Sequence, residues 1–137
     1  MKALMFHCKR YGTKIVKFSN RPKNIAPEKI CKKDQNCKDC VVVFLTVEKG
    51  DDIKICSEKI AKEISKMSIE VGHKNIILLP FAHLSSNLAD SEKVVLFLDS
   101  VEKILKDFNV QRCHFGSHKS LLMDVYGHAG NARWREF

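Results

Sequence analysis

The feature that most constrains the fold is an almost entirely apolar run at residues 41–47, VVVFLTV, which is rich in β-branched side chains. A run this short and this continuous predicts a central strand that is covered on both faces. Residues 48–52 interrupt the run. Apolar side chains then recur at helical spacing, at Ile60, Ile64, Met67 and Val71. This spacing predicts a helix over about residues 53–71, with Gly72 as its C-terminal cap.

The second half of the chain gives similar signals. Residues 76–80, IILLP, predict a second buried strand that ends at its proline. Apolar positions at helical spacing predict another helix, which begins at Asp90 or Ser91 and ends near Asn109. Two further strands are expected, at residues 110–114 and 120–126.

Near the start, two apolar runs at residues 2–8 and 14–18 are separated by the turn signal Tyr11-Gly12-Thr13, which predicts a hairpin. Residues 19–39 hold two of the three prolines and many lysines, and predict an irregular connection. Residues 131–137 read as a basic and aromatic tail. Together these elements predict an α/β (α+β) fold in which two main helices lie on one face of a mixed sheet.

Length and charge set the broad class. A chain of 137 residues and 15.7 kDa fits a single domain, residues 1–137. The net charge of +8 favours a polyanionic partner such as nucleic acid, although a solvated lysine-rich surface explains the same charge. No apolar run approaches the roughly 20 residues that cross a bilayer, and Lys9 follows the first apolar run closely. We therefore expect a cytoplasmic protein without membrane contact.

The six cysteines allow three interpretations. Cys37 and Cys40 have the spacing of half a zinc site, and Cys31 lies six residues before them. No second C-x-x-C motif supplies the remaining ligands. A structural metal and a disulfide both remain possible, but free thiols are favoured, and we expect neither a bound metal nor a cofactor.

Several familiar catalytic motifs are missing from the sequence. It has no glycine-rich phosphate loop, no H-E-x-x-H and no G-x-S-x-G, which argues against the common nucleotide-binding and serine-hydrolase classes. The remaining candidate groups lie just after predicted strands. Singly, each is explained by a structural histidine, a turn-capping serine or a surface lysine. We expect the loops that carry them to converge, because open sheets commonly bind ligands at strand ends. The candidates are His83, Ser85, Ser86, His114, His118, Lys119 and His128.

These residues carry a resemblance to a known family. The heptapeptide at residues 80–86, PFAHLSS, is its most specific part, together with Val47-Glu48-Lys49, Phe115-Gly116, Lys119 and Gly127-His128. In these motifs, and nearly end to end, the chain resembles the N-terminal editing domain of archaeal threonyl-tRNA synthetases. The resemblance implies a D-aminoacyl-tRNA deacylase-like fold, a homodimer, and hydrolysis of serine wrongly attached to tRNA(Thr). It also implies that the partners are aminoacylated tRNA(Thr) and a threonyl-tRNA synthetase catalytic module.

The resemblance also implies a set of site residues. His83 and Lys119 would be the principal catalytic side chains, with His118 as a further proton-handling group. A positioned water and the terminal ribose hydroxyl of the tRNA would assist hydrolysis. The substrate-binding residues would be Val47, Phe81, Ala82, Phe115 and Gly116, acting largely through backbone atoms.

The sequence departs from the family pattern at three places. A glutamate expected a few residues after the Gly-His pair is replaced by Ala132, an aromatic residue by His118, and an aspartate and a tyrosine by Lys9 and Arg10. These departures leave two alternatives open. One is a non-catalytic paralogue that binds tRNA or a protein partner, and the other is a deacylase for another aminoacyl or D-aminoacyl ester.

Overall fold

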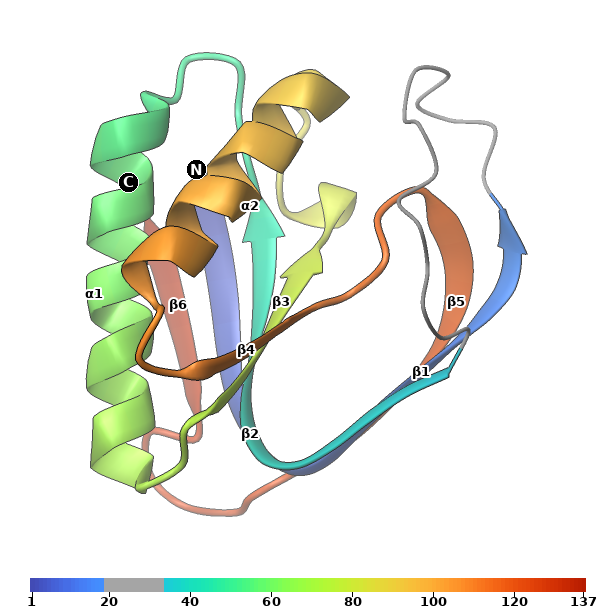
Figure 1. Cartoon of the computed structure of the whole chain (residues 1–137), viewed down its shortest axis with the longest axis vertical. Coiled ribbons are helices and arrows are strands. Elements are labelled where there is room, and N and C mark those ends of the chain that lie inside the picture. Colours follow the sequence, from blue (N-terminus) through green and yellow to red (C-terminus); the bar gives the residue numbers. More distant parts are fainter. Residues whose placement is uncertain (19–33) are drawn as a thin grey trace.

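The computed structural model describes residues 1–18 and 34–137, which form a strongly curled mixed sheet with two main helices (Figure 1). The sequence prediction of a helix over residues 53–71 with a Gly72 cap is confirmed, since Gly72 has φ 74°. The elements in chain order are β1 (Lys2–Phe18), β2 (Asp34–Thr46), α1 (Ile53–Val71), β3 (Asn75–Pro80), the 3-10 turn η1 (Ala82–Leu84), α2 (Ser91–Ile104), β4 (Asn109–Arg112), β5 (Ser117–Val125) and β6 (Ala132–Glu136).

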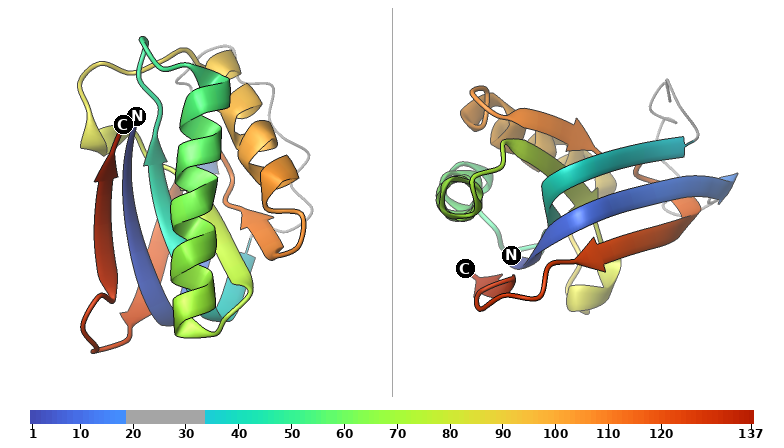
Figure 2. Two further views of the ribbon diagram at one scale, coloured as in Figure 1. Left: turned by 90° about the vertical axis from the view of Figure 1, so that its left-hand side faces the viewer. Right: turned by 90° about the horizontal axis from the view of Figure 1, so that it is seen from below.

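The sheet has the order β4-β3-β2-β1-β5, and β6 pairs with the first part of β1. Strands β2, β3 and β4 run parallel to one another, whereas β1 is antiparallel to β2, β5 and β6. The long β1 therefore has two successive partners on one edge, β6 beside residues 2–6 and β5 beside residues 8–18. The two ends of the chain lie side by side (Figure 2).

The predicted hairpin near the start is wrong, because residues 2–18 form one continuous strand. The apparent turn at residues 11–13 is paired on both sides, with residues 35–37 of β2 and residues 121–123 of β5. Gly12 serves close packing there: a Cβ at this position would meet Asn36 Oδ1 at 3.0 Å. Residues 34–39, predicted as irregular, form the start of β2, and the rest of that prediction (residues 19–33) lies outside the described residues.

Three later boundaries also differ from the predictions. Helix α2 ends at Ile104 with Leu105 as its cap, several residues before Asn109, where β4 begins. Strand β5 begins at Ser117, inside the predicted loop. The basic tail contains strand β6, which pairs with residues 2–6 of β1, and its alternating arginines reach α1: Arg133 pairs with Glu70 at 2.5 Å, and Arg135 pairs with Glu63.

Two hydrophobic cores cover the two faces of the central strand, as the continuous apolar run predicts. Val41 and Val43 face α1 and α2, which both pack on one side of the sheet (Figure 2), while Val42 and Phe44 face the opposite side. The curl of the sheet encloses that second core. The curl coincides with Asp39, whose φ is 47°, and with a register shift between Cys8 and Arg10. No helix in the described part of the chain is long and apolar enough to span a membrane.

Candidate functional site

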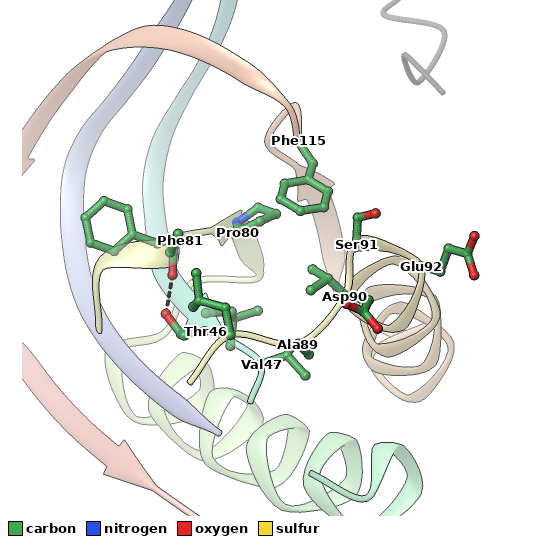
Figure 3. Close-up of a pocket in the computed structure, with 13 residues that line it drawn as sticks. Thr46, Val47, Pro80, Phe81, Ala89, Asp90, Ser91, Glu92 and Phe115 are labelled. Carbon is green, nitrogen blue, oxygen red and sulfur yellow. Dashed lines mark hydrogen bonds between the residues drawn. The ribbon is translucent and has the colours of Figure 1, made fainter. Parts of the chain in front are cut away.

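A cavity of about 800 Å³ opens where the parallel strands β2 and β3 end (Figure 3). Ligands of sheets with parallel strands commonly bind at these carboxyl ends. The lining is mostly apolar and comes from the end of β2, the turn after β3, the segment that leads into α2, and the loop before β5. The lining residues are Leu45, Thr46, Val47, Pro80, Phe81, Ala82, Leu88, Ala89, Asp90, Ser91, Glu92, Val94 and Phe115.

The turn after β3 is fixed by hydrogen bonds to both backbone groups of Phe81. Pro80 is the last residue of β3 and has no N–H to continue the ladder. The N–H of Phe81 donates to the Leu45 carbonyl at 2.8 Å, and the Thr46 hydroxyl donates to the Phe81 carbonyl (Figure 3). The N–H and the carbonyl of Phe81 are thereby both bonded to β2, and the backbone at Phe81 and Ala82 is held against the cavity.

Phe115 reaches the same cavity from the loop between β4 and β5. The Cys113 N–H donates to the Leu78 carbonyl at 2.8 Å, which extends the pairing of β4 with β3 up to this loop. The ring of Phe115 points toward Pro80 across the cavity (Figure 3). The two loops that follow β3 and β4 therefore converge on one cavity, although the histidine, serine and lysine side chains for which this convergence was predicted do not line it.

Four of the five predicted substrate-binding residues line this cavity: Val47, Phe81, Ala82 and Phe115. The fifth, Gly116, is outside the lining and adopts φ 89° directly after Phe115. His83 is also outside the lining. It is exposed on η1, next to Ala82, and its ring lies edge-on to Phe81 with 5.0 Å between the ring centroids.

Lys119 and His118 lie on β5, also outside the cavity lining. The Lys119 ammonium donates to the Ser117 carbonyl at 3.3 Å. Neighbouring residues on a strand point to opposite faces, so Lys119 shares a face with Met123, which packs into the second core, and His118 is exposed on the other face. The structure therefore gives these two predicted groups different surroundings.

Sequence reasoning missed the wall of the cavity formed by residues 88–94. Asp90 and Ser91 were recognised only as signals for a helix start, and nothing in the sequence marks Leu88 or Ala89. The charged side chains in the lining are both acidic, Asp90 and Glu92. Thr46 was missed as well, because its role depends on a contact with Phe81, 35 residues away.

The other candidate groups are placed elsewhere. His128 contacts His7 beneath the sheet, and Cys8, Cys37, Cys40, Cys56 and Cys113 are free thiols. Burial raises the pKa of the Cys8 thiol to about 11. Within residues 1–18 and 34–137, no three His, Cys, Asp or Glu side chains are grouped as metal ligands. Cys31 lies outside the described residues, so the interpretations that involve it stay open.

Comparison with known proteins identifies the family. The family model of the archaea-specific editing domain of threonyl-tRNA synthetase matches residues 1–137. The threonine–tRNA ligase editing subunit of Saccharolobus solfataricus is 40% identical over 103 residues, covering 74% of this chain and 26% of that protein. The threonine–tRNA ligase of Staphylothermus marinus is 33% identical over 132 residues, covering 93% of this chain and 21% of that protein. The chain thus spans about a quarter or less of these relatives.

A solved structure shows the same fold. The c-Myc DNA Unwinding Element Binding Protein superposes with a TM-score of 0.66 over 100% of this chain and 99% of that chain, at 14% identity. The predicted α+β fold of the D-aminoacyl-tRNA deacylase type is confirmed. The fold, the cavity and the match over residues 1–137 lead to one conclusion: the chain belongs to the archaea-specific editing domain family of threonyl-tRNA synthetase, a family of aminoacyl-tRNA deacylases.

Proposed function

We propose that this domain removes serine from mischarged tRNA(Thr) by hydrolysing the aminoacyl ester. Threonine exceeds serine by one methyl group, which is worth only about 1 to 3 kcal/mol in a binding pocket, so a second, hydrolytic site is needed for accurate charging. The observation that carries the proposal is the cavity at the ends of β2 and β3, whose lining includes Val47, Phe81, Ala82 and Phe115.

The cavity suits the aminoacylated 3′ end of a tRNA in size and in chemistry. Pockets of about 300 to 1,000 Å³ take ligands the size of a nucleoside ester, and this one measures about 800 Å³. Phe115 offers an aromatic face on which an adenine base can stack, whereas the Phe81 ring packs against Phe44 in the second core. In this proposal, backbone groups at Val47 and Ala82, two of the lining residues, recognise the small polar aminoacyl group without a dedicated side chain.

In this proposal, the Lys119 ammonium stabilises negative charge that develops on the ester carbonyl oxygen, or orients the attacking water. His83, beside Ala82 at the cavity, positions or exchanges a proton. The water attacks the carbonyl carbon, the bond to the ribose oxygen breaks, and that oxygen takes a proton. The neighbouring ribose hydroxyl holds the water in place. His118 contributes a proton only if the substrate extends over the outer face of β5.

The proposed partners follow from the same reaction. The net charge of +8 suits contact with the phosphate backbone of tRNA(Thr), and such binding is expected to weaken as salt rises. We also propose a homodimer, association with a threonyl-tRNA synthetase catalytic module, and a cytoplasmic location, where tRNA is charged. Binding of tRNA(Thr) measured at several salt concentrations tests the first of these proposals.

The decisive experiment incubates the pure protein with seryl-tRNA(Thr) and threonyl-tRNA(Thr) and follows the loss of each ester. Rapid loss of the seryl ester with the threonyl ester spared supports the proposal. Loss of both esters, or of D-aminoacyl esters from a panel of charged tRNAs, supports a deacylase of different specificity. Binding of tRNA without loss of any ester contradicts the catalytic proposal.

One observation favours the second candidate, a non-catalytic domain that binds tRNA or a protein. Ala132 stands where the family resemblance implies a glutamate, at the start of β6 and opposite Phe6 of β1. The next carboxylate along the chain, Glu136, is 3.5 Å from the Lys2 ammonium near the chain ends. No carboxylate on β6 therefore replaces the missing one at its position.

A further inference from the structure

Two loops beside the cavity are joined along their backbones. The N–H of Ala89 donates to the Val47 carbonyl at 3.0 Å, and the N–H of Lys49 donates to the Asn87 carbonyl at 3.2 Å. Between these bonds, Glu48 and the residue before Ala89 form an isolated antiparallel bridge. Val47 and Ala89 both line the cavity, where they lie next to each other (Figure 3). These contacts build one wall of the site.

A side-chain contact closes the same junction. The Ser85 hydroxyl donates to Glu48 Oε1 at 2.5 Å and accepts the N–H of Asn87 at 3.1 Å. The Ser85 hydroxyl thus acts as donor and acceptor at once, between the β2–α1 loop and the segment that follows η1.

The Glu48 carboxylate is fully engaged by its neighbours. Its Oε2 lies 3.1 Å from the amino nitrogen of Met1, and its Oε1 lies 3.8 Å from the Lys2 ammonium. The hydrogen bond from Ser85, followed by the positive charge of the amino group, lowers the pKa of Glu48. Its backbone N–H donates to Asp51 at 2.7 Å. A carboxylate with both oxygens occupied and a low pKa is a poor proton acceptor, so Glu48 is unsuited to replace the missing catalytic glutamate.

We propose that Glu48 and Ser85 are positioning residues, which hold the Val47–Ala89 wall of the cavity in place for the aminoacyl end of the tRNA. The inference rests on the proposed function for the identity of that ligand. Neither side chain lines the cavity, so both act through the backbone that does. Loss of their contact loosens the wall and weakens binding, while the groups that break the ester bond stay where they are.

The test compares Glu48→Ala and Ser85→Ala, singly and together, with two control variants on α1, outside the cavity lining, Glu58→Ala and Ser65→Ala. A hydrogen bond to a charged group is worth enough to change binding about tenfold. We expect each test variant to raise the KM for seryl-tRNA(Thr) about tenfold with kcat nearly unchanged. The double variant should be no worse than Glu48→Ala alone, because that variant already removes the contact with Ser85.

Binding is measured separately with a seryl-adenosine analogue in which an amide replaces the ester, so that no bond is cleaved. A tenfold higher Kd for the analogue in the test variants, with the Kd of the control variants unchanged, supports the proposal. A fall in kcat at unchanged KM, or additive losses in the double variant, overturns it.

Hydrogen exchange separates this inference from the proposed function. If the unaltered chain cleaves no aminoacyl ester and binds no analogue, the proposed function fails by itself. The amides of Lys49 and Ala89 then decide the positioning role. Faster exchange at these two amides in both Glu48→Ala and Ser85→Ala, at unchanged global stability, supports it, and unchanged exchange overturns it.

Discussion

The Nδ1 atom of His7 lies 2.7 Å from the Nε2 atom of His128, so the two imidazole rings share a single hydrogen across the junction between β1 and the β5–β6 loop. His7 is buried, and its ring centroid is 4.4 Å from that of Tyr126 and 5.1 Å from that of His73. The Tyr126 hydroxyl in turn donates to Asp39. Both imidazoles cannot be protonated without breaking the bond between them, because two donors would then face each other.

This pair predicts that acid destabilises the fold. Burial, and then the neighbouring His73 and His128, lower the pKa of His7 below its ordinary value of 6.5, against a smaller opposing effect of Asp39. The unfolded chain therefore binds the proton more readily, and the free energy of unfolding falls as pH drops below about 6.5, by at most about 1.4 kcal/mol per pH unit for one proton. Urea unfolding of the parent protein and of His7→Gln between pH 7.5 and 5 checks this. The slope of the free energy of unfolding against pH should be smaller in His7→Gln than in the parent protein, and unchanged in His118→Gln. Equal slopes in the parent protein and both variants would contradict this prediction.

Lys119 and His118 offer a test of which face of β5 meets the substrate. Removing one group that stabilises an oxyanion typically costs about a hundredfold or more in rate. Lys119→Met is expected to lower serine release from seryl-tRNA(Thr) at least that far, with Lys119→Arg retaining part of the rate. His118→Ala should lose less than about threefold, because its side chain points away from the face that Lys119 occupies. The reverse ranking would place the substrate on the outer face.

Thr46 holds the turn that carries Phe81, and a substitution of equal size isolates its hydroxyl. Thr46→Val leaves the Phe81 carbonyl without its side-chain donor at a buried position, which costs about 1 to 3 kcal/mol of stability. We also expect a higher KM, since the displaced turn lines the cavity. Thr46→Ser keeps the hydroxyl and should stay close to the parent protein. Thermal unfolding and deacylation kinetics together measure both effects, and equal behaviour of the two variants would remove Thr46 from this role.

Local signals in the sequence were sufficient for the centre of the fold. The helix over residues 53–71 and the buried strand at residues 41–47 follow from apolar periodicity, which depends only on neighbouring residues. The heptapeptide at residues 80–86 also pointed to the right edge of the sheet, since Phe81 and Ala82 line the cavity.

The failures share a cause in contacts between distant residues. Gly12 looks like a turn residue, yet it lies within β1 because it allows Asn36 to approach closely. Strand β6 forms by pairing with residues 2–6 of β1, at the other end of the chain, and its Arg133 and Arg135 also pair with glutamates of α1, more than 60 residues earlier. Residues 88–90 of the cavity wall are irregular chain whose position depends on hydrogen bonds to the β2–α1 loop. Neither the secondary-structure propensity of single residues nor the spacing of apolar residues along the chain predicts such pairings.

The replacement of a family glutamate by Ala132 predicts a gain of activity on restoring the carboxylate. Ala132 is exposed at the start of β6, so a longer side chain fits there without disturbing either core. If the domain retains the rest of its machinery, Ala132→Glu should speed serine release about tenfold or more, the lower range for a positioned acid–base group. Ala132→Gln introduces a side chain of the same shape as glutamate but without the charge, and it should not speed serine release. Single-turnover deacylation measures the rate in both variants, and the melting temperature is the folding control. An equal effect of both variants would mean that the side chain at 132 acts through packing and not as a proton acceptor.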